Sequence, residues 1–297
     1  MKKYRARKIE ERFFHSLFFI NGILVIVVLA GIFAILLKTA APAFREIDLR
    51  EFFFTVHWDP AGYEKESYGI IAMLVSTFLV TLGALAIAIP IGIGAAAYLC
   101  DVAGPRVREI AKPLIEVLAA IPSVVLGFIG IVVVNPMLAK FFRQPNGLNA
   151  VNGSILLAIM ALPTIISITE DALVSVPRSF EQASLALGAT KWQTIIRVKI
   201  PAALSGIIAA CMLGMGRAIG ETMTVLMATG CAPALPTSYL HAVRTMTATI
   251  AIELGEVPYY STHYYGLFAI GLTLFIITFM INLVADLVLH NFQKMQR

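Results

Sequence analysis

The chain has 297 residues, of which 59% are hydrophobic and only 14% are charged, and its mean hydropathy is +0.83. About a quarter of the residues in soluble globular proteins are charged, so this composition excludes an ordinary soluble domain and indicates an integral membrane protein. The net charge of +5 comes from basic residues divided among several membrane-flanking segments, which favours contact with membrane lipid and gives no support to a nucleic-acid partner.

Six apolar runs are long enough to cross a bilayer, which takes roughly 20 residues each. The sequence therefore predicts an all-α integral membrane protein with six transmembrane helices. The first run is too long for the core of a secretory signal and lacks a good cleavage site, so we expect an uncleaved anchor. The runs begin near Phe13, Gly69, Pro113, Val151, Ser205 and Tyr264.

The distribution of Lys and Arg sets the expected orientation. Of the 23 basic residues, fifteen lie in segments on one side of the six predicted helices and seven lie on the other, while Arg217 falls within a helix. The positive-inside rule then predicts that both termini are cytoplasmic. Two long connections, Lys38 to Tyr68 and Cys231 to His263, fall on the outer side and are candidates to receive an extracytoplasmic partner. Residues Thr245 to Glu256 are predicted to form a short helix on that surface.

Prolines lie inside three of the predicted helices, where each removes a backbone hydrogen bond and crowds the preceding turn. Pro90 is expected to kink the second helix, and Pro122, beside Ser123, and Pro163 are expected to interrupt the third and fourth. These three prolines are candidate hinges of a protein that changes shape. The alternative is that proline is simply commoner in membrane helices than in soluble ones.

The loop at residues 178–201 is too polar to span a membrane and too regularly patterned to be a slack linker. Helix-forming residues fill Ser179 to Leu187, and Gly188 stands where a left-handed C-terminal cap is favoured. Thr190 and Gln193 then form a capping-box pattern for a second short helix. We expect a cytoplasmic knob that docks into another protein, with a self-packing amphipathic loop as the alternative.

The fifth run carries Arg217 and Glu221, and a charged side chain at the centre of a membrane helix costs about 2.5 to 3.5 kcal/mol on insertion scales. Counted from Ser205, Arg217 lies roughly 18 Å into a core about 30 Å thick. A guanidinium presents a planar fork of donors to oxyanions, and Glu221 is expected to neutralise it when no anion is present. We therefore expect both side chains on a polar substrate path, with Ser123 and Thr222 as weaker hydroxyl donors. A static ion pair that joins two helices is the alternative.

Motifs for catalysis or metal binding do not occur in the sequence. The three cysteines form no CxxC or Cys/His spacing, and neither HExxH nor GxSxG is present. A glycine-rich GxxxxGK[ST] phosphate loop is also missing from the sequence. We therefore expect a transport subunit that is not an enzyme, has no metal site and binds no cofactor of its own.

The segment from Glu181 to Ala189 resembles the EAA loop of ABC importer permeases. Gln182 and Ser184 depart from the pattern of that loop. In that family the loop forms the coupling helices that insert into a cleft of a separate ATPase subunit, and the resemblance implies the same role here. The matching positions are Glu181, Ala183, Gly188 and Ala189.

Three further segments resemble the C-type permease subunit of bacterial phosphate importers (PstC): Leu118 to Gly127, Gly216 to Met223 and Thr247 to Pro258. The resemblance implies a type I ABC importer permease fold. Residues 71–290 would form the ABC type-1 transmembrane domain, with the coupling loop at about 178–201. Residues 1–70 would form a cytoplasmic tail, the first transmembrane helix and an extracytoplasmic loop, and residues 291–297 a second cytoplasmic tail.

The same resemblance implies the permease subunit of an importer that moves inorganic phosphate across a bacterial or archaeal cytoplasmic membrane by alternating access. Its implied partners are an A-type phosphate permease subunit, two copies of an ABC ATPase subunit that uses ATP and Mg, and an extracytoplasmic phosphate-binding protein. One alternative keeps the mechanism but carries molybdate, sulfate or phosphonate. Another is a proton-driven secondary transporter that uses Glu221 and needs no knob.

Overall fold

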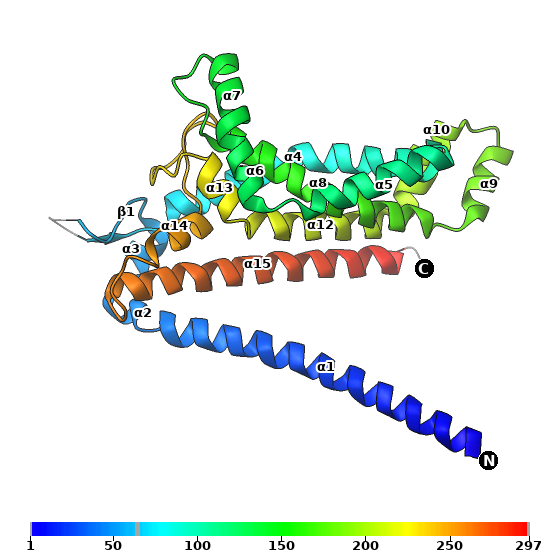
Figure 1. Ribbon diagram of the computed structural model, residues 1–297, viewed down its shortest axis with the longest axis horizontal. Helices are drawn as coiled ribbons and strands as arrows, with labels where there is room; N and C mark the ends of the chain where they lie inside the picture. The colour runs from blue at the N-terminus through cyan, green and yellow to red at the C-terminus, as the bar shows by residue number, and fades with distance from the viewer. Residues whose placement is uncertain (1, 63–65, 296–297) are drawn as a thin grey trace.

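The computed structural model describes residues 2–62 and 66–295, with side chains over 14–62 and 66–287. Most of the long helices run side by side along one axis, and α1 diverges from them (Figure 1). The long helices are α1 (Lys2–Ala40), α4 (Ile71–Ala97), α5 (Pro105–Ala120), α8 (Ala150–Val174), α12 (Leu204–Ile219) and α15 (Thr262–Met295). The shorter helices are α2 (Ala43–Glu46), α3 (Leu49–Phe54), α6 (Ser123–Ile129), α7 (Asn135–Phe142), α9 (Arg178–Ala186), α10 (Lys191–Thr194), α11 (Ile200–Ala202), α13 (Met223–Ala228) and α14 (Met246–Glu253).

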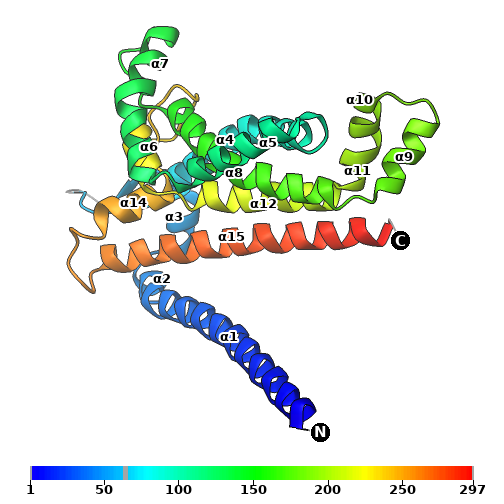
Figure 2. The ribbon, with the colours of Figure 1, turned by 45° about the vertical axis from the view of Figure 1, so that its right-hand side comes forward.

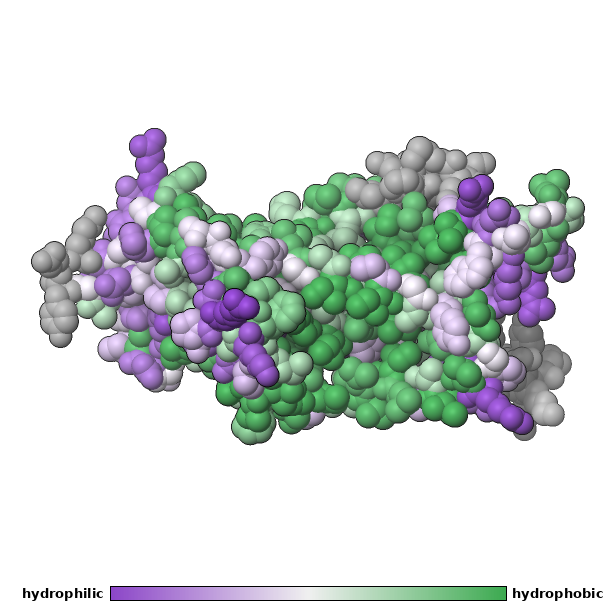
Figure 3. All heavy atoms as spheres, turned by 90° about the horizontal axis from the view of Figure 1, so that it is seen from above, coloured by the Kyte–Doolittle hydropathy of each residue, from purple (hydrophilic) through white to green (hydrophobic). Residues whose placement is uncertain are grey.

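Within the described residues, five helical stretches are long and apolar enough to cross a membrane. A sixth apolar stretch is a pair of helices, Lys191–Ala202 and Leu204–Ile219, bent by 72°. Apolar side chains fill the middle of the molecule and polar ones cover both ends (Figure 3). The prediction of an all-α membrane protein is therefore confirmed, with six spans when the bent pair is taken as one. The five stretches are Phe14–Glu46, Ile71–Val102, Ser123–Phe142, Ala150–Val174 and Thr262–Leu287.

The third span begins later than the sequence predicted. Its apolar stretch starts at Ser123 rather than near Pro113, which lies inside α5. The backbone of Ile121 is extended, as expected for a residue that precedes a proline, and this ends α5 before Pro122. The predicted break at Pro122 is thus confirmed. The expected interruption at Pro163 is wrong, because α8 continues as a single helix through it. α4 also continues through Pro90, and the kink expected there stays a prediction.

Small side chains let α4 and α8 pack closely at the centre of the bundle. Ala84, Ala88 and Ala161 are fully buried there. A methyl group added at Gly92 would lie 2.6 Å from the side chain of Ile165. In a bilayer the hydrophobic effect does not drive helices together, because lipid tails are as apolar as the side chains. Close packing of small residues supplies the attraction between helices instead.

The first helix stands apart from this bundle. The C-terminal part of α1 contacts α15, and toward its own N-terminal end α1 diverges from α15 (Figures 1 and 2). None of the apolar window of its span is buried within the chain. The start of α1 and the end of α15 lie at the same end of the molecule as α9 and α10 (Figure 1).

The opposite end is built from the two long connections and contains elements that the sequence did not predict. Helices α2 and α3 are followed by a short antiparallel hairpin, β1 (Trp58–Asp59) with β2 (Ser67–Tyr68), in which Trp58 pairs with Tyr68. The predicted short helix is present at this end as α14, but only its C-terminal part lies on the surface, where Ala251 is exposed. Its first turn is buried, and there the Met246 backbone N–H donates to Thr77 Oγ1 of α4 at 3.1 Å.

Candidate functional site

Two helix breaks lie side by side in the middle part of the molecule. One separates α5 from α6 at Pro122, and the other separates α12 from α13 at Gly220 to Thr222. Thr224 Oγ1 of α13 donates to the Ser123 carbonyl of α6 at 3.0 Å. Both breaks lie alongside the middle of α15 rather than near its ends (Figure 1). Broken helices at membrane depth place backbone polar groups where they line a cavity rather than lipid.

Arg217 lies in the last turn of α12, beside these breaks, and its side chain is exposed. Its two terminal nitrogens approach Thr164 Oγ1 and the Ala119 carbonyl, each at 3.5 Å. The guanidinium therefore sits at the C-terminal ends of α5 and α12, where the helix dipoles favour a cation. Both contacts are at the long limit for hydrogen bonds. The guanidinium is positioned by these two contacts, but its N–H donors remain available. This suits a side chain that receives an oxyanion.

The expected pairing of Arg217 with Glu221 is wrong for this structure. The helix ends at Ile219, so the two residues do not stand one turn apart on a continuous helix. Glu221 Oε1 instead accepts from the Thr224 backbone N–H at 3.2 Å, at the start of α13, and the Glu221 carbonyl accepts from Thr247 Oγ1 at 2.8 Å. Among the described residues, the ion pairs of the chain do not include Arg217 with Glu221.

The two weaker candidates lie at the same breaks. Ser123 is the first residue of α6 and is half-buried. Thr222 lies between α12 and α13 and lines an open cavity of about 520 Å³, which is also lined by Thr247 of α14 and by Tyr259, beyond the end of that helix. The cavity thus extends from the α12–α13 break along α14. The structure therefore brings Ser123, Arg217, Glu221 and Thr222 together around two adjacent breaks.

The predicted knob at the other end is present in detail. α9 ends at Ala186, Gly188 has φ of +80°, and both hydrogen bonds of the capping box between Thr190 and Gln193 form. Glu181, Ala183 and Gly188 thus lie in the first helix and its cap, and Ala189 lies in the turn that follows. Ser184 Oγ of α9 and Thr194 Oγ1 of α10 are 2.9 Å apart, which ties the two short helices together.

The knob presents apolar side chains to its surroundings. Leu187 is 89% exposed, and Trp192 and Ile196 are each more than half exposed. The neighbouring Ile195, by contrast, is only 2% exposed and packs in the core with Leu173. An exposed apolar group of this kind on an otherwise polar element is typical of a protein-contact surface.

Three groups of bonded charges escaped the sequence analysis, because each contains a partner that is distant in the chain. At the knob end, Lys199 bonds Asp101, and Glu170 of α8 bonds Arg108 at 2.6 Å and Lys112 at 3.3 Å. The one available signal was an acidic residue inside an apolar run, Glu170. In the described ranges, no three His, Cys, Asp or Glu side chains converge to hold a metal ion.

The third group joins the outer connections around Glu253, at the end of α14. Its carboxylate accepts from Trp58 Nε1, bonds His263 Nε2 and accepts from an Arg244 terminal nitrogen, each at 2.8 Å. Burial alone would raise the pKa of Glu253, but the hydrogen bonds from His263 and Trp58 and the charge of Arg244 outweigh burial and lower the pKa. The cluster holds the C-terminal end of α14 in place. Near the N-terminal end of α14, Thr247 Oγ1 donates to the Glu221 carbonyl at the α12–α13 break.

Residues 88–297 match the family model described as "Binding-protein-dependent transport system inner membrane component". The chain belongs to this family. It is 38% identical over 234 residues to the probable ABC transporter permease protein YqgH of Bacillus subtilis, covering 79% of this chain and 75% of that protein. It is 32% identical over 302 residues to the phosphate transport system permease protein PstC of Mesorhizobium japonicum, covering 95% and 90%. The resemblance to ABC importer permeases of the C type is thereby confirmed.

Solved structures support the same fold. An inward-facing form of the MetNI methionine ABC transporter superposes with a TM-score of 0.59 at 19% identity, covering 75% of this chain and 95% of the other. A bacterial alginate ABC transporter in complex with its periplasmic protein gives 0.56 at 18% identity, covering 89% and 92%. The fold is therefore that of type I ABC importer permeases. The chain is a multi-pass inner-membrane transport component.

Proposed function

We propose that this chain is the permease subunit of an ATP-driven importer of inorganic phosphate. The observation that carries the proposal is the exposed guanidinium of Arg217 at two adjacent helix breaks, in a chain that is 32% identical to a phosphate transport system permease over 95% of its length. A partly dehydrated phosphate needs concentrated, directional hydrogen-bond donors, and a guanidinium supplies them without losing its charge.

The proposed route leads from the outer end to the breaks. An extracytoplasmic binding protein releases the anion near the hairpin and α14, and the cavity lined by Thr222 and Thr247 leads it inward. The anion then meets Arg217, with Ser123 and Thr222 as hydroxyl donors. Because the Arg217 side chain is exposed in this chain alone, we infer that an A-type permease subunit faces it and closes the path.

Energy comes from a separate ATPase in this proposal. The exposed Leu187, Trp192 and Ile196 of the knob dock into a cleft of that ATPase, of which two copies bind ATP and Mg. The knob end is then cytoplasmic, as are both termini, which lie at the same end (Figure 1). Nucleotide-driven movement of the knob rocks the helices around Pro122 and the α12–α13 break, and so alternates access between the two sides. Pro90 and Pro163 remain candidate hinges within continuous helices.

A purified complex of this chain with its A-type subunit, ATPase and binding protein tests the proposal. ATP turnover is measured in liposomes with phosphate, sulfate, molybdate or a phosphonate. We expect phosphate to stimulate turnover most strongly. Stimulation by another oxyanion and not by phosphate would contradict the assigned substrate. Uptake that an ionophore abolishes at constant ATP would contradict the energy source and favour proton coupling.

A further inference from the structure

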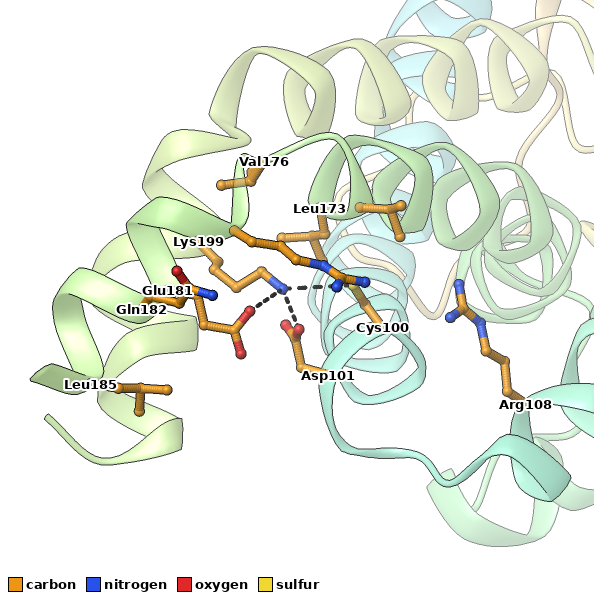
Figure 4. A pocket seen from close by; sticks show the side chains of 11 residues that line it. Cys100, Asp101, Arg108, Leu173, Val176, Glu181, Gln182, Leu185 and Lys199 are labelled. Carbon is orange, nitrogen blue, oxygen red and sulfur yellow. Dashed lines mark hydrogen bonds and ion pairs between the residues drawn. The ribbon is translucent and has the colours of Figure 1, made fainter.

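A buried ion pair connects the knob to the bundle. Lys199 lies in the five-residue π-helical turn Ile195–Lys199 that follows α10, and Asp101 lies in a second such turn, Tyr98–Val102, that ends α4. The side chains bond each other and are only 8% and 7% exposed. The pair therefore links α4 directly to the segment that carries α9 and α10 (Figure 4).

Stability alone does not account for this pair. Removing two charges from water carries a desolvation penalty that their mutual attraction does not reliably repay, and well-packed apolar residues join two elements as firmly. The penalty is higher here, because Asp101 Oδ2 is buried without a hydrogen-bond partner among the described residues. An ion pair whose burial carries such a desolvation penalty has a use if its side chains exchange partners as the protein moves.

A second carboxylate, that of Glu181 on the knob, lies near Lys199. Glu181 Oε2 of α9 lies 3.9 Å from Lys199 Nζ, and the Glu181 side chain is 36% exposed. A cavity of about 490 Å³ borders all three side chains and extends past Leu173 and Leu185. Lys199 thus stands between one carboxylate fixed at the end of α4 and another on α9, with space beside it for a change of position (Figure 4).

We propose that Lys199 is a positioning residue that transmits movement of α9 to α4 by exchanging its carboxylate partner between Asp101 and Glu181. In the state described here Lys199 is bonded to Asp101, and Glu181 is near but not closely bonded. A shift of α9 toward Lys199 brings Glu181 into hydrogen-bond range and frees Asp101, so α4 is released from the knob. The inference rests on the proposed function, in which α9 meets the ATPase.

Replacing the pair by apolar residues of similar size separates this role from a structural one. In the double variant Asp101→Leu with Lys199→Met, α4 and the knob stay joined but the exchange is lost. The matched control is Arg108→Met with Glu170→Leu, because that pair links α5 to α8 and, among the described residues, neither side chain forms an ion pair with Glu181. The complexes are compared for assembly, for ATP turnover with and without binding protein, and for uptake of whichever oxyanion stimulates the parent complex.

We expect the Asp101/Lys199 variant to assemble and to hydrolyse ATP with little dependence on the binding protein, while uptake per ATP falls at least about tenfold. The control keeps the parent ratio. Parent-level uptake per ATP in the Asp101/Lys199 variant overturns the inference, and so does failure of that variant alone to assemble, since the pair would then be structural. A parent complex that no oxyanion stimulates refutes the proposed function instead.

Discussion

The charged side chains of this chain differ in how firmly they are held by their partners. Glu253 has three partners from three segments, and Lys199 has its closest partner 98 positions away. Arg217 differs, because its two contacts are long and leave the guanidinium exposed. In the proposed function, the arginine with the weakest contacts receives the anion, whereas the more tightly bonded charges hold segments of the chain together.

The lowered pKa of Glu253 predicts how acid affects the outer end. Because the folded-state pKa lies below the usual value of about 4.3, the stabilisation that Glu253 supplies is fully present above that value and is lost as the pH falls through the folded pKa. Thermal unfolding of the purified complex should therefore become easier below about pH 4.

In Glu253→Gln that acid-dependent loss should be smaller, and at neutral pH the variant should be less stable by about 1.5–3 kcal/mol, since Arg244 loses a charged acceptor. Glu256→Gln, which changes an exposed carboxylate three residues on, serves as the control. Identical pH profiles for the parent and Glu253→Gln would contradict the assignment.

At the scale of elements, the candidate functional residues lie at the ends and breaks of helices, and the long helices α4 and α8 form the packed centre. The two short helices of the knob keep their relative positions through the Gly188 turn and the bond between Ser184 and Thr194. Gly188 is surrounded by open space, since a methyl group added there would have no neighbouring atom within 4 Å. Glycine is therefore favoured at this position by the backbone conformation and not by lack of room. A φ of +80° strains any residue with a side chain, although Asn tolerates this region best.

Gly188→Pro should therefore weaken capture of the ATPase. Proline fixes φ near −65° and removes the N–H that Gly188 donates to the Leu185 carbonyl at 3.0 Å, and such backbone strain is worth about 1–3 kcal/mol. We expect normal membrane insertion but strongly reduced co-purification of the ATPase, with Gly188→Asn close to the parent. Equal ATPase recovery with Gly188→Pro and the parent would count against docking through this turn.

The local features of these elements could be predicted from the sequence, and the long-range ones could not. The Gly188 cap, the capping box of Thr190 and the break at Pro122 depend on residues within one turn, so the pattern alone specifies them. α12 ends at Ile219 with Gly220 as its C-cap, and the Glu221 that follows is held by Thr247 of α14, a contact that no local pattern encodes. The expected Arg217–Glu221 pair was therefore wrong, although both residues do lie at the break.

At the scale of the whole molecule, the two ends of the bundle are connected to its middle by different elements. α14 joins the Glu253 cluster of the outer end to the break at Glu221, through Thr247. The pair of Asp101 and Lys199 joins the knob to α4, whose buried face packs along α8. The first connection reaches the break beside Arg217, and the second reaches α8, which also carries Thr164, a contact of Arg217. In the proposed function these connections couple the two ends to a central site.

The most direct test of this account is uptake by Arg217→Gln in the assembled complex, in a strain without other phosphate importers. Arg143→Gln is the matched control, since Arg143 is an exposed arginine at the end of α7, away from both breaks. We expect phosphate uptake by Arg217→Gln to fall roughly 10- to 100-fold, equivalent to about 1.4 to 2.8 kcal/mol, with subunit assembly unchanged and Arg143→Gln near the parent. Parent-level uptake by a fully assembled Arg217→Gln complex would contradict the central claim that this guanidinium lies on the path of the anion.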